Sequence, residues 1–138
     1  MKLKTSWIII GVILFAAILA TLNFPGRDPY AKLRGTERDL DATLAAGRPS
    51  IIELGTKSCP FCKALYPILA KLGSEYAGRL NVLIVDVDEQ VGVARRYNVT
   101  AVPVILFYDA QGKQLRRFEG FMSYDDLKAA MASHKLVP

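Results

Sequence analysis

The only two cysteines of the chain, Cys59 and Cys62, lie two residues apart in the segment SCPFCK, residues 58–63. Apolar residues at 51, 52 and 54 precede them and apolar residues recur at helical spacing after them, which indicates a strand-to-helix junction. Pro60 then occupies the first helical turn and biases the residue before it toward extended geometry. A sulfur at a helix N-terminus faces unpaired amides and the positive end of the helix dipole, which favour thiolate. We therefore expect Cys59 to be the nucleophile of a redox dithiol, with Cys62 as the resolving thiol on the same helical face.

Three other interpretations of this pair compete with the redox dithiol. A purely structural disulfide is disfavoured because so short a loop removes little entropy from the unfolded chain. A metal site is disfavoured because one CxxC motif supplies two ligands and the single histidine, His134, lies in the C-terminal tail. The third interpretation is a pair of incidental buried cysteines. The redox dithiol is favoured over all three, so we expect no resident metal.

The composition limits the size and partners of the folded part. The chain has 138 residues and a formal net charge of +5, with lysines and arginines scattered among acids. Behind an apolar N-terminal segment there is room for one domain of about 105 residues with a single core. We expect an ordinary solvated surface, no nucleic-acid partner and no cofactor. No dimerisation segment is visible, so a monomer is expected.

Residues 7–24 form an almost wholly apolar stretch. A membrane-spanning helix needs about 20 such residues, and Trp7 would lie at the membrane interface. The alternative is a cleaved signal peptide, but the best cleavage position, after Ala20, has Ile18 where a small residue is needed. An uncleaved N-terminal transmembrane helix is the favoured prediction.

The orientation of this segment is not decided by its flanking charges, because basic residues lie on both sides. A short N-terminus before a signal-like apolar core normally stays in the cytoplasm, which places the folded domain on the extracytoplasmic, periplasmic side. The expected organisation is a membrane anchor at 1–24, a linker at 25–32 and a folded domain at 33–138.

The domain alternates between helical and strand patterns. Thr36 and Ser123 are each followed three residues later by aspartate, which is typical of a capping box at a helix start. The residues over 80–87 are too apolar to leave a wet face, which predicts a central strand covered on both sides. Expected helices cover 36–46, 60–76, 89–97 and 123–134, and expected strands cover 50–54, 80–87, 99–108 and 113–119. This order predicts an α/β domain with a mixed central β-sheet flanked by helices.

Pro103 interrupts one of these strand patterns, where it cannot donate a ladder hydrogen bond. At the start of a strand it could instead turn the chain, through a cis bond, and expose a backbone edge beside a functional site.

Taken together, these motifs resemble the thioredoxin family over about residues 33–135. The resemblance rests on CPFC at a helix start, Pro67 within that helix, the Ala-Val-Pro of 101–103 before a strand, and Gly120 after the last strand. It implies a thioredoxin fold and protein disulfides as substrates.

The resemblance also implies a substrate-binding surface. Pro103 would be the family's cis-proline that packs against the disulfide, and Val102 would offer its backbone to an extended substrate segment. Pro60 and Phe61, between the cysteines, are expected to bind substrate on the same surface. If the loop after Gly120 folds alongside, Phe61 would form an apolar rim there with Tyr124 and Phe121. Phe121 is expected either in this rim or in the core.

Glu53 lies six residues before Cys59, where thioredoxins carry a buried acid that relays a proton to and from the resolving cysteine. A carboxyl group buried without a partner has a raised pKa, which suits acid–base work near neutrality. The competing interpretation is a glutamate on the surface or on an edge strand. We expect Glu53 to be the third catalytic residue, after Cys59 and Cys62.

Several residues depart from the family pattern. Ser58 and Gly55 stand where thioredoxins commonly have tryptophan, and Ile84 stands where a lysine often pairs with the buried acid. The chain therefore does not resemble a general cytoplasmic thioredoxin. A glutamate in place of the usual aspartate resembles the membrane-tethered thioredoxin-like reductases instead.

The expected function is thiol–disulfide exchange, most simply the reduction of disulfides in extracytoplasmic proteins with electrons from a membrane-embedded thiol reductase. The sequence leaves three alternatives open. These are a disulfide oxidase or isomerase, a dithiol module that binds Cu(I) or Zn(II) without redox turnover, and a tethered adaptor that only binds a partner.

Overall fold

The computed structural model describes residues 2–22 and 28–137. The chain divides into two compact units, Met1–Ala31 and Lys32–Pro138. Each unit is described by itself below.

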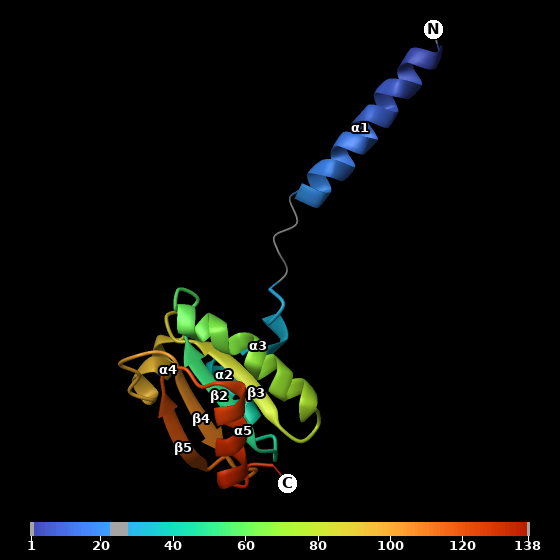
Figure 1. Ribbon diagram of the computed structural model, residues 1–138. Helices are drawn as coiled ribbons and strands as arrows, with labels where there is room; N and C mark the ends of the chain where they lie inside the picture. The colour runs from blue at the N-terminus through green and yellow to red at the C-terminus, as the bar shows by residue number, and fades with distance from the viewer. Residues whose placement is uncertain (1, 23–27, 138) are drawn as a thin grey trace. The chain divides into compact units, whose positions relative to one another are not determined.

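The first unit contains one long helix, α1 (Lys2–Leu22), shown in blue in Figure 1. Its large apolar side chains between Trp7 and Leu19 are exposed, with Trp7 at 76%. The described part of the chain contains no helix that is long and apolar enough to cross a membrane. The structure thus does not show the transmembrane helix expected over 7–24, and residues 23–27, which end that stretch and begin the expected linker, lie outside the described residues.

The second unit is built on one five-stranded sheet in the order β1-β3-β2-β4-β5. The strands β1, β3 and β2 are mutually parallel, whereas β4 pairs antiparallel with both β2 and β5, so the predicted mixed sheet is confirmed. The strands are β1 (Arg34–Gly35), β2 (Ser50–Gly55), β3 (Asn81–Asp86), β4 (Val104–Tyr108) and β5 (Gln114–Glu119). Sequence patterning missed β1 and the short 3-10 helix η1 (Ala31–Leu33) before it, because two residues are too few to show a period.

Helices cover both faces of this sheet, and Figure 1 shows α3 and α5 on one side with α2 and α4 behind. The helices are α2 (Glu37–Leu44), α3 (Pro60–Glu75), α4 (Val91–Arg96) and α5 (Tyr124–Ser133). Both predicted capping boxes are confirmed: Thr36 caps α2 with Asp39, and Ser123 caps α5 with Asp126.

The alternation of side chains along β2 assigns its residues to the two helical layers. Ile52 and Leu54 belong to a buried apolar cluster that includes Leu40 of α2 and Val93 of α4. Successive strand residues point to opposite faces, so Glu53 points toward the layer of α3 and α5. All six residues of β2 are buried.

One expected strand is shorter than predicted. The segment 99–103 is not extended in the sheet, and β4 begins only at Val104. The Val102–Pro103 peptide bond is cis, as the sequence suggested for this position. Gly120, at φ 94°, donates its N–H to the Pro103 carbonyl at 2.8 Å. The chain therefore turns at Pro103 instead of continuing the ladder, because proline has no N–H to donate.

Candidate active site

Cys59 is the N-cap residue of α3, with Pro60 at the first helical position. Its backbone is extended, at φ −75° and ψ 117°, and its Sγ accepts the Cys62 N–H at 3.2 Å. One of the unpaired amides at the helix start is thereby directed at sulfur. The local geometry predicted for the dithiol is confirmed, and both cysteines are free thiols.

The two sulfurs lie in different environments. Cys59 is partly exposed, whereas Cys62 is completely buried one helical turn further along α3. Burial raises the pKa of the Cys62 thiol, and the neighbouring Cys59 side chain and Glu53 raise it further. An incoming disulfide can therefore reach Cys59 first, while Cys62 needs a proton acceptor before it can react.

Glu53 lies beneath this pair with no exposed surface, so the interpretation as a surface glutamate is wrong. Neither carboxyl oxygen has a hydrogen-bond partner within the described residues. Burial raises the pKa of Glu53 to about 8, against the opposing influence of Cys62 and Arg34 and with a small addition from Asp86. A buried carboxyl group that titrates near neutrality can both take up and release a proton there.

Gly55 makes room for this carboxyl group. A Cβ on Gly55 would overlap a Glu53 carboxyl oxygen and would lie 2.8 Å from the Cys62 Sγ. Residues two apart in a strand share a face, so Glu53 can extend its side chain along β2 only because the next residue on that face has none. The departure noted at Gly55 is therefore what lets the longer acid reach the resolving cysteine.

Asp86, at the end of β3, holds the loop that leads into α3. It is 8% exposed, and its Oδ2 accepts the Lys57 N–H at 3.1 Å while its Oδ1 accepts the N–H of Asp88 at 3.0 Å. The Cys59 N–H donates to the Thr56 carbonyl at 3.3 Å, which closes the same loop. Sequence reasoning missed Asp86, although an aspartate at the end of an otherwise apolar strand was a visible signal.

The expected substrate-binding residues are placed around the same end of the sheet. Val104 pairs with Leu54, so Pro103 lies beside the end of β2 from which the active-site loop departs. Pro103 is buried and Val102 half-buried, whereas Pro60 is exposed and Phe61 is 63% exposed. Phe121 is 46% exposed, so its assignment to the core is wrong.

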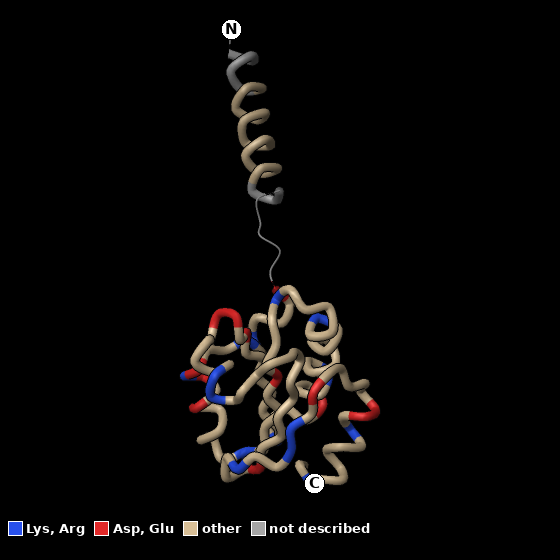
Figure 2. The backbone as a smooth tube through the Cα atoms, turned by 90° about the vertical axis from the view of Figure 1, so that its left-hand side faces the viewer, with Lys and Arg blue, Asp and Glu red and all other residues tan. Residues whose placement is uncertain are grey.

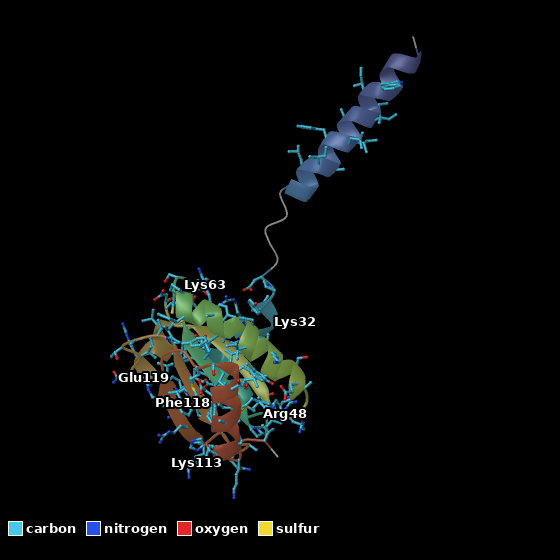
Figure 3. The ribbon with its side chains drawn as sticks, viewed as in Figure 1. Lys32, Arg48, Lys63, Lys113, Phe118 and Glu119 are labelled. Carbon is cyan, nitrogen blue, oxygen red and sulfur yellow. The ribbon has the colours of Figure 1, made fainter. Side chains whose placement is uncertain are left out.

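Charged residues around the dithiol do not form a single-sign patch. The exposed Lys57 pairs with Glu89, and in Figure 3 Lys63 lies near the start of α3, at the other end of the domain from Arg48 and Lys113. Figure 2 shows acidic and basic residues interspersed over the domain. Within residues 2–22 and 28–137, no group of three or more His, Cys, Asp or Glu residues could hold a metal ion.

Comparison with known proteins agrees with this architecture. A family model described as Thioredoxin matches residues 32–133. The chain belongs to the thioredoxin family. It is 26% identical over 104 residues to the thioredoxins of Staphylococcus aureus strains Mu50 and MW2, an alignment that covers 75% of this chain and 98% of each relative. A crystal structure of chloroplastic thioredoxin z has the same fold, with a TM-score of 0.67 at 23% identity, covering 74% of this chain and 92% of that one.

Thioredoxin-family proteins are thiol–disulfide oxidoreductases, and this protein is an enzyme of that class. The matched segment contains the whole dithiol site, from Arg34 through Gly120. The apolar helix α1 lies outside it.

The Glu53 titration predicts a pH-dependent stability. In the native protein Glu53 holds its proton up to about pH 8, whereas its ordinary pKa is 4.5. The native state binds the extra proton between these values, so the free energy of unfolding should fall as the pH rises from about 4.5 to about 8. Denaturant unfolding across this range should show the fall in the native sequence and not in Glu53→Gln. Parallel stability curves for the two proteins would contradict this assignment.

Proposed function

We propose that the protein reduces disulfide bonds in extracytoplasmic proteins, with Cys59 as nucleophile, Cys62 as resolving thiol and Glu53 as the proton carrier between steps. The observation that carries the proposal is the depth at which the three reacting groups lie below the protein surface. An accessible sulfur caps a helix, a buried sulfur lies one turn below it, and a buried acid lies against the second sulfur.

In the first step the Cys59 thiolate attacks one sulfur of the substrate disulfide. A mixed disulfide forms between Cys59 and that sulfur, and the other substrate sulfur leaves as a thiolate. The Cys62 N–H, which donates to Cys59 Sγ at 3.2 Å, stabilises negative charge on the sulfur before attack.

In the second step Cys62 attacks the Cys59 sulfur and releases the second substrate thiolate. The Cys59–Cys62 disulfide that forms leaves the protein oxidised and the substrate reduced by two electrons. The proton of the Cys62 thiol passes to the Glu53 carboxylate, because both groups border the space that a side chain on Gly55 would fill. A pKa of about 8 lets Glu53 accept the proton here and return it when the disulfide is reduced again.

The substrate segment binds across the end of the sheet where the loop before α3 begins. Phe61 and Pro60 supply exposed apolar surface beside Cys59, and Val102 offers its backbone next to the cis-proline Pro103. The hydrogen bond from Gly120 N–H to the Pro103 carbonyl holds this turn in place.

The direction of electron flow is inferred from Glu53. A glutamate stands at the position of the buried acid, as it does in the membrane-tethered thioredoxin-like reductases that this sequence resembles. Electrons would come from a membrane-embedded thiol reductase that reduces the Cys59–Cys62 disulfide after each turnover.

The reduction potential of the Cys59–Cys62 couple tests this direction. Equilibration of the protein in defined thiol–disulfide buffers at about pH 7 should give a value near that of thioredoxin, about −270 mV. A reduction potential of about −120 mV would identify an oxidant that inserts disulfides and would overturn the reductase proposal.

Trapping experiments test the roles of the two cysteines. Cys62→Ser should accumulate mixed disulfides with client proteins in cells, because the first attack proceeds and resolution cannot. Cys59→Ser should accumulate none, because the sulfur that remains is completely buried. Non-reducing gels of the two variants, with the double variant as the background control, make the comparison. Equal trapping by both single variants would contradict the assignment.

The N-terminal segment is proposed to attach the enzyme to the membrane from the extracytoplasmic side. The sequence over 7–24 is the support, together with the helical conformation of residues 2–22 and the exposure of its apolar side chains. The full-length protein should remain with membranes during alkaline extraction, and a membrane-impermeant maleimide added to intact cells should label Cys59. Release of the full-length protein into the soluble fraction would contradict anchoring, and labelling only after lysis would contradict the orientation.

A further inference from the structure

Arg34, Ile84 and Glu53 form one row across three parallel strands. Arg34 of β1 is paired with Ile84 of β3, and Ile84 is paired with Glu53 of β2. Residues paired directly across neighbouring strands point to the same face of a sheet. Arg34 and Glu53 therefore point into the same helical layer from either side of Ile84, with their Cα atoms about 10 Å apart at the usual strand spacing.

The side chain of Arg34 extends into this layer over α3. Its guanidinium carbon lies 4.8 Å from the ring centroid of Tyr66, and Arg34 is half-buried. Tyr66 is itself buried and follows Cys62 by one helical turn, so the ring and the resolving thiol share one face of α3. The guanidinium is thereby held among the side chains that surround the Glu53 carboxyl group.

We propose that Arg34 is a positioning residue for the exchange reaction. From the edge strand β1, its guanidinium group supplies the positive charge that stabilises the ionised form of Glu53. The lysine that often accompanies the buried acid in this family is absent, because its position is Ile84. Arg34 stands next to that position in register and brings a positive charge to the same row. Arginine suits this place because its guanidinium stacks on an aromatic ring while remaining charged.

The other groups that face Glu53 do not supply this charge. Cys62 and Tyr66 come from α3 and are neutral as thiol and phenol, and burial raises the pKa of both. Asp86 at the end of β3 is an acid and raises the pKa of Glu53, whereas Arg34 lowers it. Among the residues that act on the Glu53 carboxyl group, Arg34 is the cation.

Substitution of Arg34 tests the inference. The effect of Arg34 on the exchange rate rests on the proposed role of Glu53, whereas the charge interaction between the two residues does not. In Arg34→Met the long apolar stem over Tyr66 is retained and the charge removed. Carboxyl-carbon NMR of the reduced full-length protein should show the pH midpoint of Glu53 raised by about one pH unit. Arg34→Lys should return the midpoint close to that of the native sequence, since the charge is restored.

Arg38→Met is the matched control, because Arg38 is exposed and lies beside Asp39 in α2. It should leave the Glu53 midpoint unchanged. An unchanged midpoint in Arg34→Met, or an equal shift in Arg38→Met, would overturn the proposal. Arg34→Gln gives the same comparison should the methionine variant fold poorly.

The rate of exchange with glutathione disulfide, measured against pH, separates this inference from the function proposed above. A shift of the rate profile in Arg34→Met that disappears in a Glu53→Gln background supports both. A shifted NMR midpoint with an unshifted rate profile would retain the charge interaction between Arg34 and Glu53, but it would reject both Glu53 as the proton carrier and Arg34 as a positioning residue for exchange. A rate shift of the same size in the Glu53→Gln background would show that Arg34 acts elsewhere and would overturn the proposal.

Discussion

The hydrogen bond from the Cys62 amide to the Cys59 sulfur is the interaction on which the rest of the site depends. It exists because Cys59 is the N-cap of α3, with the following proline already in the helix. An N-cap side chain normally accepts from an amide of the first turn, and here a sulfur takes the place of the usual oxygen. The sheet, the loop before α3 and the buried acid can all be described by how they hold this helix start and serve its two sulfurs.

The sheet places the buried acid under α3 because side chains along a strand alternate between its two faces. Leu54 points into the apolar cluster beneath α2 and α4, and the residue before it, Glu53, points to the opposite layer under α3. A shift of one residue in the register of β2 would place the carboxyl group in the apolar cluster and either Ile52 or Leu54 against Cys62. The buried strand pairs on both of its edges fix that register, so the chemistry of the acid depends on packing several residues away.

The sequence predicted the dithiol geometry and both capping boxes because each depends on local patterns. It predicted the mixed sheet because the order of strands and helices along the chain favours that arrangement. The N-terminal position of Cys59 follows from Pro60, and the start of α5 follows from Ser123 and Asp126. Strand β1 was missed because two residues carry no periodic pattern, and with it the row that joins Arg34 to Glu53 across Ile84. The start of β4 was placed too early because the apolar residues before Pro103 resemble a strand, and only the three-dimensional structure shows the chain turning there.

Glu53 and Gly55 are matched in size, and this links two positions that differ from the common thioredoxin pattern. A glutamate fits beneath Cys62 only while the residue two positions on has no side chain, because any Cβ there would meet the carboxyl group. A bulky residue at position 55 would require a shorter acid at position 53. The two positions are therefore expected to change together in evolution, so that a large side chain accompanies aspartate and glycine accompanies glutamate. In a related sequence, the residue at the position of Gly55, which takes no part in the reaction, would then predict whether the buried acid is aspartate or glutamate.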